Sequence, residues 1–216
     1  MAPPTDAHDP ILAPPRHRGP TSGYPVAVLS ARGLAKWYGG ARVFEGVHFD
    51  LVRGDILAIT GPNGSGKSTL LRIIAGLETQ TNGDVERSAS DALGYAGPEL
   101  GLYAHLTGAE HVSFVSALRS VAPDFGVLAY VGLSGAEHKR IGAYSTGMKS
   151  RLRLALALIG RPVLLLLDEP GASLDAQGRR LVADIVREQA KQGAVLLATN
   201  DPEERLLADM ELRLDA

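Results

Sequence analysis

Residues 61–69 have the residue types and the spacing that chemistry on a phosphate group requires. The segment matches the pattern G-x-x-x-x-G-K-[ST] and reads Gly61-Pro62-Asn63-Gly64-Ser65-Gly66-Lys67-Ser68-Thr69. Glycines let the backbone approach phosphate oxygens where a Cβ would clash, and a helix that follows them aims its positive end at the same anion. We expect Lys67 to meet the β- and γ-phosphates of a nucleoside triphosphate and Ser68 to ligate Mg²⁺. A chance match is disfavoured, because a buried-strand pattern precedes the loop and a helical pattern follows it.

Two adjacent acids, Asp168 and Glu169, end a run of four leucines at 164–167. A strand that ends beside a phosphate-binding loop is where Mg²⁺ sits, so we expect Asp168 to hold the ion, through water. Glu169 alternates to the other side and can polarise an attacking water. The alternative is a turn or helix that starts at Pro170 with two capping acids, since acids are common at helix starts.

Strands that alternate with helices along the chain predict a mainly parallel α/β sheet that carries these residues. Strands are expected at 26–30, 47–52, 55–60, 84–86, 93–96, 163–167 and 194–198, and helices at 67–76, at 176–192 and from about 202. Residues from about 100 to 160 have helix-like apolar spacing and few strand signals, which predicts a helical insert.

Composition limits the class of protein. The 216 residues suffice for a packed core, and 45% hydrophobic with 21% charged residues is ordinary for a globular chain. A net charge of −2 is untypical of a general nucleic-acid binder. The chain has no cysteine, which excludes disulfides and thiolate metal sites and fits a reducing cytoplasm. We find no apolar stretch of about 20 residues and no signal-peptide pattern.

Residues 1–25 contain seven of the 13 prolines, so they are predicted to form a disordered tail before a domain at 26–216. A docking peptide is the alternative for this segment, on a weak compositional signal.

Over residues 28–215 the chain resembles the nucleotide-binding domain of ABC transporters. The resemblance implies a P-loop NTPase fold of the α/β class, with a mainly parallel core sheet, a small antiparallel β subdomain and a helical insert. It also implies ATP and Mg²⁺ as ligands. Tyr38 occupies the place of the aromatic that stacks on adenine. The segment Tyr144-Ser145-Thr146-Gly147-Met148-Lys149 is similar to the family signature, with Thr146 in place of a glycine.

In the family the signature segment acts on the nucleotide of the opposite subunit, so Ser145, Thr146 and Gly147 are expected to contact ATP in a dimer. The helix start at Ser145 supplies N–H groups for a γ-phosphate. By the same resemblance, Asp175 in the loop after the acids is expected to couple the two sites. On the residues alone, a plain capped helix at 145 and a half-buried aromatic at 38 were the simpler interpretations.

Two positions depart from the family pattern. The usual glutamine after the 93–96 strand falls on Pro98 or Glu99, and Glu99 could replace it as a Mg²⁺ or water contact. Asn200 stands where the family usually has a histidine. Asparagine can donate a hydrogen bond to a γ-phosphate but carries no proton or positive charge. With Lys67 and Glu169 as the other catalytic residues, we therefore predict slow hydrolysis.

The resulting hypothesis is an ATP-hydrolysing motor subunit that drives transport through separate membrane permease subunits. It would lie at the cytoplasmic face of the membrane, as a homo- or heterodimer, and resembles subunits of the ABC-2 and haem-exporter type. One alternative is a weakly or non-hydrolysing regulatory subunit paired with an active partner. Another is a soluble ABC ATPase acting on DNA or ribosomes; the single domain with no heptad run or basic stripe disfavours it, so no nucleic-acid partner is expected.

Overall fold

The computed structural model describes residues 27–87 and 92–215, so the predicted tail at 1–25 lies outside the described residues. A five-stranded sheet forms the centre, in the order β5-β6-β7-β3-β8, and all four neighbouring pairs are parallel. The strands are β3 (Ile56–Thr60), β5 (Leu93–Ala96), β6 (Leu164–Asp168), β7 (Ala194–Ala198) and β8 (Met210–Arg213). The mainly parallel core sheet is thereby confirmed.

Alternation along the central strands divides the core into two layers. In β6, Leu164 and Leu166 pack in one hydrophobic cluster, whereas Leu165 and Leu167 pack in the other. Successive side chains of a strand point to opposite faces, so a strand covered on both faces needs an unbroken apolar run. This is why four consecutive leucines are all buried here.

A second, antiparallel sheet covers one of these layers, together with helix α1 (Lys67–Ala75). It has the order β2-β1-β4 and consists of β1 (Leu29–Tyr38), β2 (Ala41–Leu51) and β4 (Asn82–Arg87). The β1–β2 turn is Gly39-Gly40, and both residues have positive φ, the conformation that a two-residue hairpin loop of type I′ requires. This sheet is the expected small antiparallel β subdomain.

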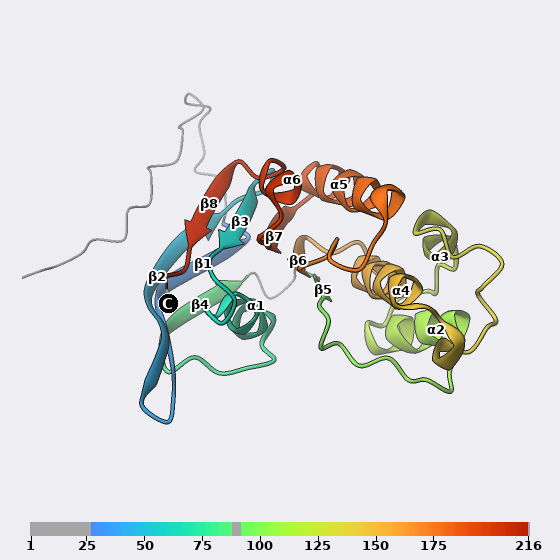
Figure 1. The fold of residues 1–216 in the computed structure, drawn as a ribbon, viewed down its shortest axis with the longest axis horizontal. Coiled ribbons are helices and arrows are strands. Elements are labelled where there is room, and N and C mark those ends of the chain that lie inside the picture. The colour runs from blue at the N-terminus through green and yellow to red at the C-terminus, as the bar shows by residue number, and fades with distance from the viewer. Residues whose placement is uncertain (1–26, 88–91, 216) are drawn as a thin grey trace, which may run out of the picture.

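The helical insert lies on the other side of the molecule, away from the antiparallel sheet (Figure 1). It contains α2 (Gly108–Leu118), α3 (Gly126–Tyr130), a 3₁₀ turn η1 (Ile141–Ala143) and α4 (Thr146–Leu158). Thr107 forms a capping box with Glu110 at the start of α2. The Thr107 hydroxyl accepts from the Glu110 backbone N–H, and the Glu110 carboxylate accepts from the Thr107 backbone N–H. The predicted insert at about 100–160 is therefore helical, as expected.

The C-terminal part returns to the sheet through α5 (Ala176–Ala190) and α6 (Pro202–Arg205). Strand β8 was not predicted, and β1 and β2 extend well beyond the two short strands expected from their apolar runs. No helix among the described residues has the length and apolarity to cross a bilayer.

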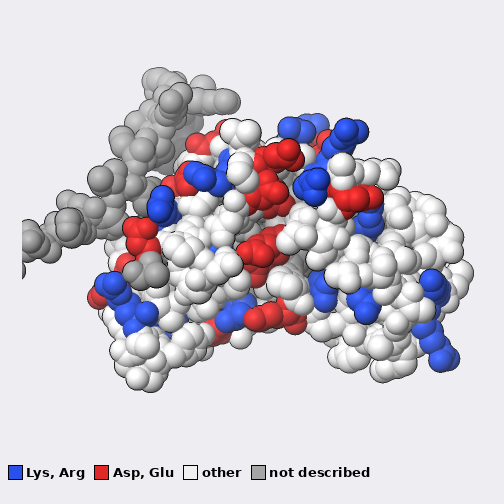
Figure 2. Space-filling model, viewed as in Figure 1, with Lys and Arg blue, Asp and Glu red and all other residues white. Residues whose placement is uncertain are grey.

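Charge is unevenly distributed on the face shown in Figure 2. Acidic side chains gather along its middle, between the strand-rich part and the helical part, while lysines and arginines are scattered around them. An acidic middle of this kind favours cations there and gives a polyanion no continuous basic surface on this face.

Candidate functional site

The carboxyl ends of three neighbouring strands bring the predicted phosphate chemistry together. The glycine-rich loop follows β3, Asp168 and Glu169 end or follow β6, and Asn200 follows β7, which lies between the other two. Hydrogen bonds join these ends: Thr199 N–H donates to Ile59 O over 3.0 Å, and Glu169 N–H donates to Ala198 O over 2.9 Å. Parallel topology therefore places all three segments at one edge, where ligands of open α/β sheets bind.

The loop at 61–69 forms a cradle that only glycine permits at its tightest points. Gly66 has a φ of 95°, and a Cβ there would lie 2.5 Å from Val43 Cγ1. The Lys67 side chain is buried and its Nζ donates to the carbonyl oxygens of Gly61, at 2.8 Å, and Pro62, at 3.1 Å. The Ser65 hydroxyl is buried with no hydrogen-bond partner in the described structure. The lysine thus points back into its own loop.

Asp168 is the buried acid of the site. It is only 3% exposed, and neither carboxylate oxygen has a hydrogen-bond partner among the described residues. Burial raises the pKa of this carboxyl, the nearby Ser68 hydroxyl opposes the rise, and Glu169 and Glu99 add to it. An unpaired buried carboxylate is costly, so it needs a counter-charge. A hydroxyl beside two unpaired carboxylate oxygens is a donor set of the hard-oxygen type that fits Mg²⁺.

Glu169 and Asn200 have exposed side chains beside this cradle. Glu169 has a φ of 46°, an uncommon left-handed conformation for a residue with a side chain. The Asn200 amide nitrogen donates to Asn63 Oδ1 in the glycine-rich loop over 3.2 Å. Asn200 therefore contacts the cradle directly, whereas Glu169 follows the end of the neighbouring strand β6.

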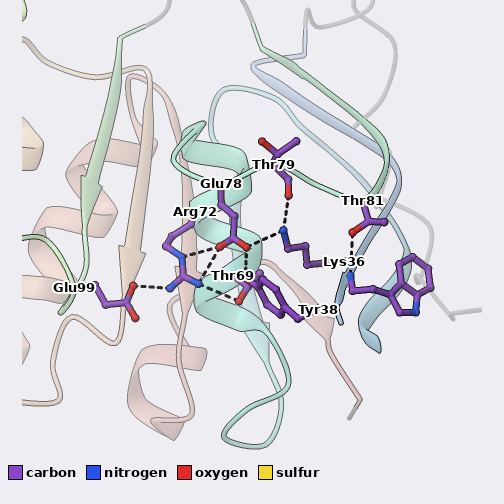
Figure 3. A network of polar contacts seen from close by, with 9 residues as sticks. Lys36, Tyr38, Thr69, Arg72, Glu78, Thr79, Thr81 and Glu99 are labelled. Carbon is purple, nitrogen blue, oxygen red and sulfur yellow. Dashed lines mark hydrogen bonds and ion pairs between the residues drawn. The ribbon is translucent and has the colours of Figure 1, made fainter. Parts of the chain in front are cut away.

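Tyr38 lies beside α1 in a polar network that the sequence did not predict (Figure 3). Its hydroxyl donates to Glu78, and the Lys36 ammonium lies 4.7 Å from the centre of its ring. Arg72 donates to Glu78 over 3.1 Å and to Glu99 over 2.6 Å. The predicted metal ligand Glu99 is thus paired with Arg72, and its side chain is 64% exposed. The ring of Tyr38 itself is half-exposed.

The predicted signature residues lie at the start of α4, on the helical side of the molecule (Figure 1). Ser145 caps this helix by accepting from Met148 N–H over 3.2 Å, and Gly147 approaches the carbonyl oxygen of Ser173. Asp175 caps α5 by accepting from Gly178 N–H over 2.8 Å. The structure thus places Gly147 beside Ser173 in the loop that follows Glu169, while Ser145 and Thr146 are exposed at the start of α4.

Residues 44–172 match the family model described as ABC transporter. The chain belongs to the ABC transporter family of ATP-binding proteins. It is 39% identical over 80% of its length to the uncharacterized ABC transporter ATP-binding protein YxlF of Bacillus subtilis, but spans only 62% of that protein. It is 42% identical to the cytochrome c biogenesis ATP-binding export protein CcmA of Rhodobacter capsulatus, over 81% of the chain and 82% of the relative.

Solved structures agree with this family. A structure titled as the ATP-binding subunit of an ABC transporter superposes with a TM-score of 0.78 at 26% identity, over 87% of this chain and 85% of the other. The ATP-binding cassette MJ0796, solved as a dimer bound to ADP and Pi, has a TM-score of 0.77 at 21% identity, over 86% of this chain and 94% of the other. The latter likeness supports the P-loop ABC fold.

Three residues at the site of this ABC protein were missed in the sequence. Arg72 lies in the amphipathic helix α1, and Glu78 lies just after its end. No local sequence pattern shows that Glu78 contacts Tyr38 or that Arg72 contacts Glu99. Glu204 is 5% exposed, although its segment 202–205 looks like a surface turn with acids in its first turn. Only the packing of α6 against the loop after Glu169 reveals it.

Proposed function

We propose that this chain binds Mg-ATP and hydrolyses it as the motor subunit of an ABC transporter. The observation that carries the proposal is the pairing of a glycine cradle around a buried lysine with a buried, unpaired acid at the neighbouring strand end. Lys67 is inside the loop and Asp168 has two oxygens without partners. A triphosphate with its cation would supply the missing partners of both groups.

The residues of the cradle have separable roles. Ser68 and Asp168 would hold Mg²⁺, and when bound this ion offsets the negative charge of the phosphates. Lys67 exchanges its two carbonyl contacts for the β- and γ-phosphates. Ser65 and the backbone N–H groups of the loop then donate to phosphate oxygens, together with the start of α1.

Glu169 holds and polarises the attacking water, and the Asn200 amide donates to the γ-phosphate after leaving Asn63. Without a proton to offer, Asn200 gives a weaker contact than a histidine would, so turnover is slow. At Glu99, a metal would compete with Arg72, which already pairs with one carboxylate oxygen of this residue. Tyr38 offers an exposed ring for adenine at the side of α1.

The dimer is supported by where the signature segment lies. Ser145 and Thr146 are exposed on the helical side, apart from the cradle of the same chain, so they are available to the ATP of a second subunit. Asp175 follows the Glu169 loop and would connect the two sites. The second subunit is this chain or a related one.

The partners that complete the transporter are separate permease subunits, which would hold this chain at the cytoplasmic face of the membrane. The likeness to CcmA, which is named as an export protein of cytochrome c biogenesis, supports export, and the haem-exporter or ABC-2 type is the finer assignment that we propose. Nucleic acid is not expected as a partner, since the face in Figure 2 has no continuous basic surface.

Replacement of Lys67 by alanine tests this proposal. Loss of a charge-assisted contact should weaken Mg-ATP binding by about 10- to 100-fold and remove hydrolysis. Titration calorimetry and single-turnover hydrolysis with labelled ATP measure the two effects. Lys191→Ala removes an exposed lysine on the far end of α5 and should change neither. Full ATP affinity in Lys67→Ala would exclude the cradle as the nucleotide site.

A regulatory subunit with little or no hydrolysis is the second candidate, and the Asn200–Asn63 contact favours it. In that case the chain would bind ATP tightly and pair with an active partner. Asn200→His decides between the two: a motor slowed by Asn200 should turn over faster by about 10- to 100-fold in this variant. No gain in single-turnover rate would favour the regulatory function.

A further inference from the structure

Glu204 on α6 is a buried acid to which the proposed chemistry assigns no role. Its side chain is 5% exposed, and Oε1 accepts from the backbone N–H of Gly171 over 2.8 Å. The other oxygen, Oε2, is buried and has no hydrogen-bond partner in the part of the chain that the structure describes. Glu203, its neighbour on the same short helix, is exposed instead.

Gly171 belongs to the tight turn that begins at Glu169. The N–H of Ala172 donates to the Glu169 carbonyl over 3.2 Å, and the N–H of Glu169 donates to Ala198 of β7 over 2.9 Å. Glu169 itself has a left-handed φ of 46°, a strained conformation for a residue with a Cβ. Such a conformation persists only where the surrounding structure stabilises it, and the hydrogen bond from Gly171 N–H to Glu204 is one such contact.

Glu204 is also fixed to the loop that carries Asn200. Asp201 caps α6 by accepting from Glu203 N–H over 2.7 Å, and its own N–H donates to the Thr199 hydroxyl over 2.9 Å. The 199–201 loop and the first turn of α6 therefore form one hydrogen-bonded unit. Through the Gly171 contact, this unit is tied to the segment of Glu169.

Burial of this carboxyl has a cost that a helix-surface acid does not bear. Burial raises the pKa of Glu204, the Thr199 hydroxyl and the Gly171 N–H lower it, and Asp201 and Glu169 raise it further. Exposure, as at Glu203, would avoid that cost, and in the buried position the hydrogen bond from the Gly171 N–H, together with the Thr199 hydroxyl, offsets it.

We infer that Glu204 is a positioning residue for hydrolysis: by holding the Gly171 N–H from the Asn200 loop, it fixes Glu169 in the conformation that addresses the attacking water. This inference rests on the proposed function, in which Glu169 acts on that water. The proposed function gives Glu204 no contact with the nucleotide or the metal, so this residue should affect the rate of hydrolysis and not the binding of ATP.

The test compares Glu204→Ala, Glu204→Gln and Glu203→Ala in the full chain. Glu204→Ala should lower kcat on the order of 10- to 100-fold and leave KM and the Mg-ATP dissociation constant within about twofold. Glu204→Gln keeps an oxygen that accepts from Gly171 and should restore most of kcat. Glu203→Ala removes the exposed acid on the same helix and should match the unchanged chain.

A steric experiment reaches the same contact from the other side. A Cβ added at Gly171 would lie 2.4 Å from Glu204 Oε1. Gly171→Ala should therefore lower kcat in the presence of Glu204. In the Glu204→Ala background the same change should cost much less, because the clashing oxygen is gone. Additive effects of the two substitutions would overturn the inference.

Two further outcomes would also overturn the positioning role of Glu204. The first is a kcat in Glu204→Ala equal to that of Glu203→Ala. The second is a parallel loss of ATP affinity and thermal stability in all Glu204 variants, which would mean that the residue is purely structural. Glu169→Gln separates this failure from failure of the proposed function. If Glu169→Gln abolishes hydrolysis while Glu204→Ala does not change it, only the positioning role is wrong.

Discussion

At the carboxyl edge of the parallel sheet, Asp168 buries two oxygens that have no hydrogen-bond partner among the described residues, whereas in the helical insert the buried His111 uses both ring nitrogens. One nitrogen of His111 accepts from Tyr103 N–H over 3.0 Å, and the other lies 2.9 Å from the carbonyl oxygen of Thr107. The insert is not free of unpaired groups, since the Ser116 hydroxyl is buried without a partner, but it contains no buried, unpaired acid.

Apolar residues show the opposite contrast. Strands β3, β6 and β7 bury every residue, whereas the insert and its borders expose a set of large apolar side chains: Tyr103, Phe114, Leu118, Val121, Phe125 and Tyr130. At the sheet edge, the Asp168 carboxylate is therefore left without a protein partner among the described residues, whereas in the insert both ring nitrogens of His111 contact protein groups. Polar residues at the sheet edge should therefore matter for function, and the polar residues that cap and pack α2 should matter for stability.

The largest expected effect tests the sheet edge. Asp168→Asn should lower ATP turnover about 10²- to 10³-fold, because in the proposed function this carboxylate holds Mg²⁺. It should not lower the free energy of unfolding without nucleotide at neutral pH, because it also removes a buried, unpaired charge. Single-turnover hydrolysis and urea denaturation measure the two. Asp184→Asn, at an exposed acid, is the control. A destabilised variant with normal turnover would reverse the comparison.

An intermediate effect tests the insert. Thr107→Ala breaks the capping box of α2 and should lower the free energy of unfolding by about 1 kcal/mol, with Mg-ATP affinity unchanged. Denaturation curves and calorimetric titration provide the measurements. Ser113→Ala, which removes an exposed hydroxyl from the same helix, should cost less. A loss of ATP affinity in Thr107→Ala would mean that the two regions are not energetically separate.

The smallest effect concerns pH and a buried acid at the border of the site. Because the folded-state pKa of Glu204 is raised, the native protein binds more protons than the unfolded chain at pH values above the ordinary carboxyl range. The contribution of Glu204 to the free energy of unfolding is therefore present at low pH. It is lost as the pH rises from about 4.5 through the raised folded-state pKa of this residue. Asp201 and Glu169 face this group as acids, and Arg179 borders Gly171 as a cation.

Glu204→Gln should accordingly flatten the decline of stability with rising pH. Thermal unfolding followed between about pH 4.5 and 8 would show it as a smaller drop in Tm than in the unchanged chain. Glu203→Gln serves as the matched control, because its side chain is exposed. Identical pH profiles for Glu204→Gln and the unchanged chain would mean that Glu204 titrates normally.

Prediction from sequence succeeded where a pattern is local. The leucine run before Asp168 gave strand β6, and the glycines and Lys67 gave the cradle and α1. Prediction failed where the pairing partner is distant in the sequence. Strand β8 is four residues long and mostly not buried, and it pairs with the edge of β3, where Leu57 lies opposite Met210. Such a short segment has too little local preference to be recognised as a strand.

The sequence by itself determined the glycine-rich loop at 61–69, the two acids at the end of β6 and the alternation of strands and helices, because these depend on residue type and on periodicity within a few turns of chain. Only the tertiary structure decided that Arg72 holds Glu99, that Lys67 points into its own loop, and that Glu204 reaches Gly171 from 33 positions away. Contacts of this kind come from the order of strands in the sheet and the packing of helices on it, which no local pattern encodes.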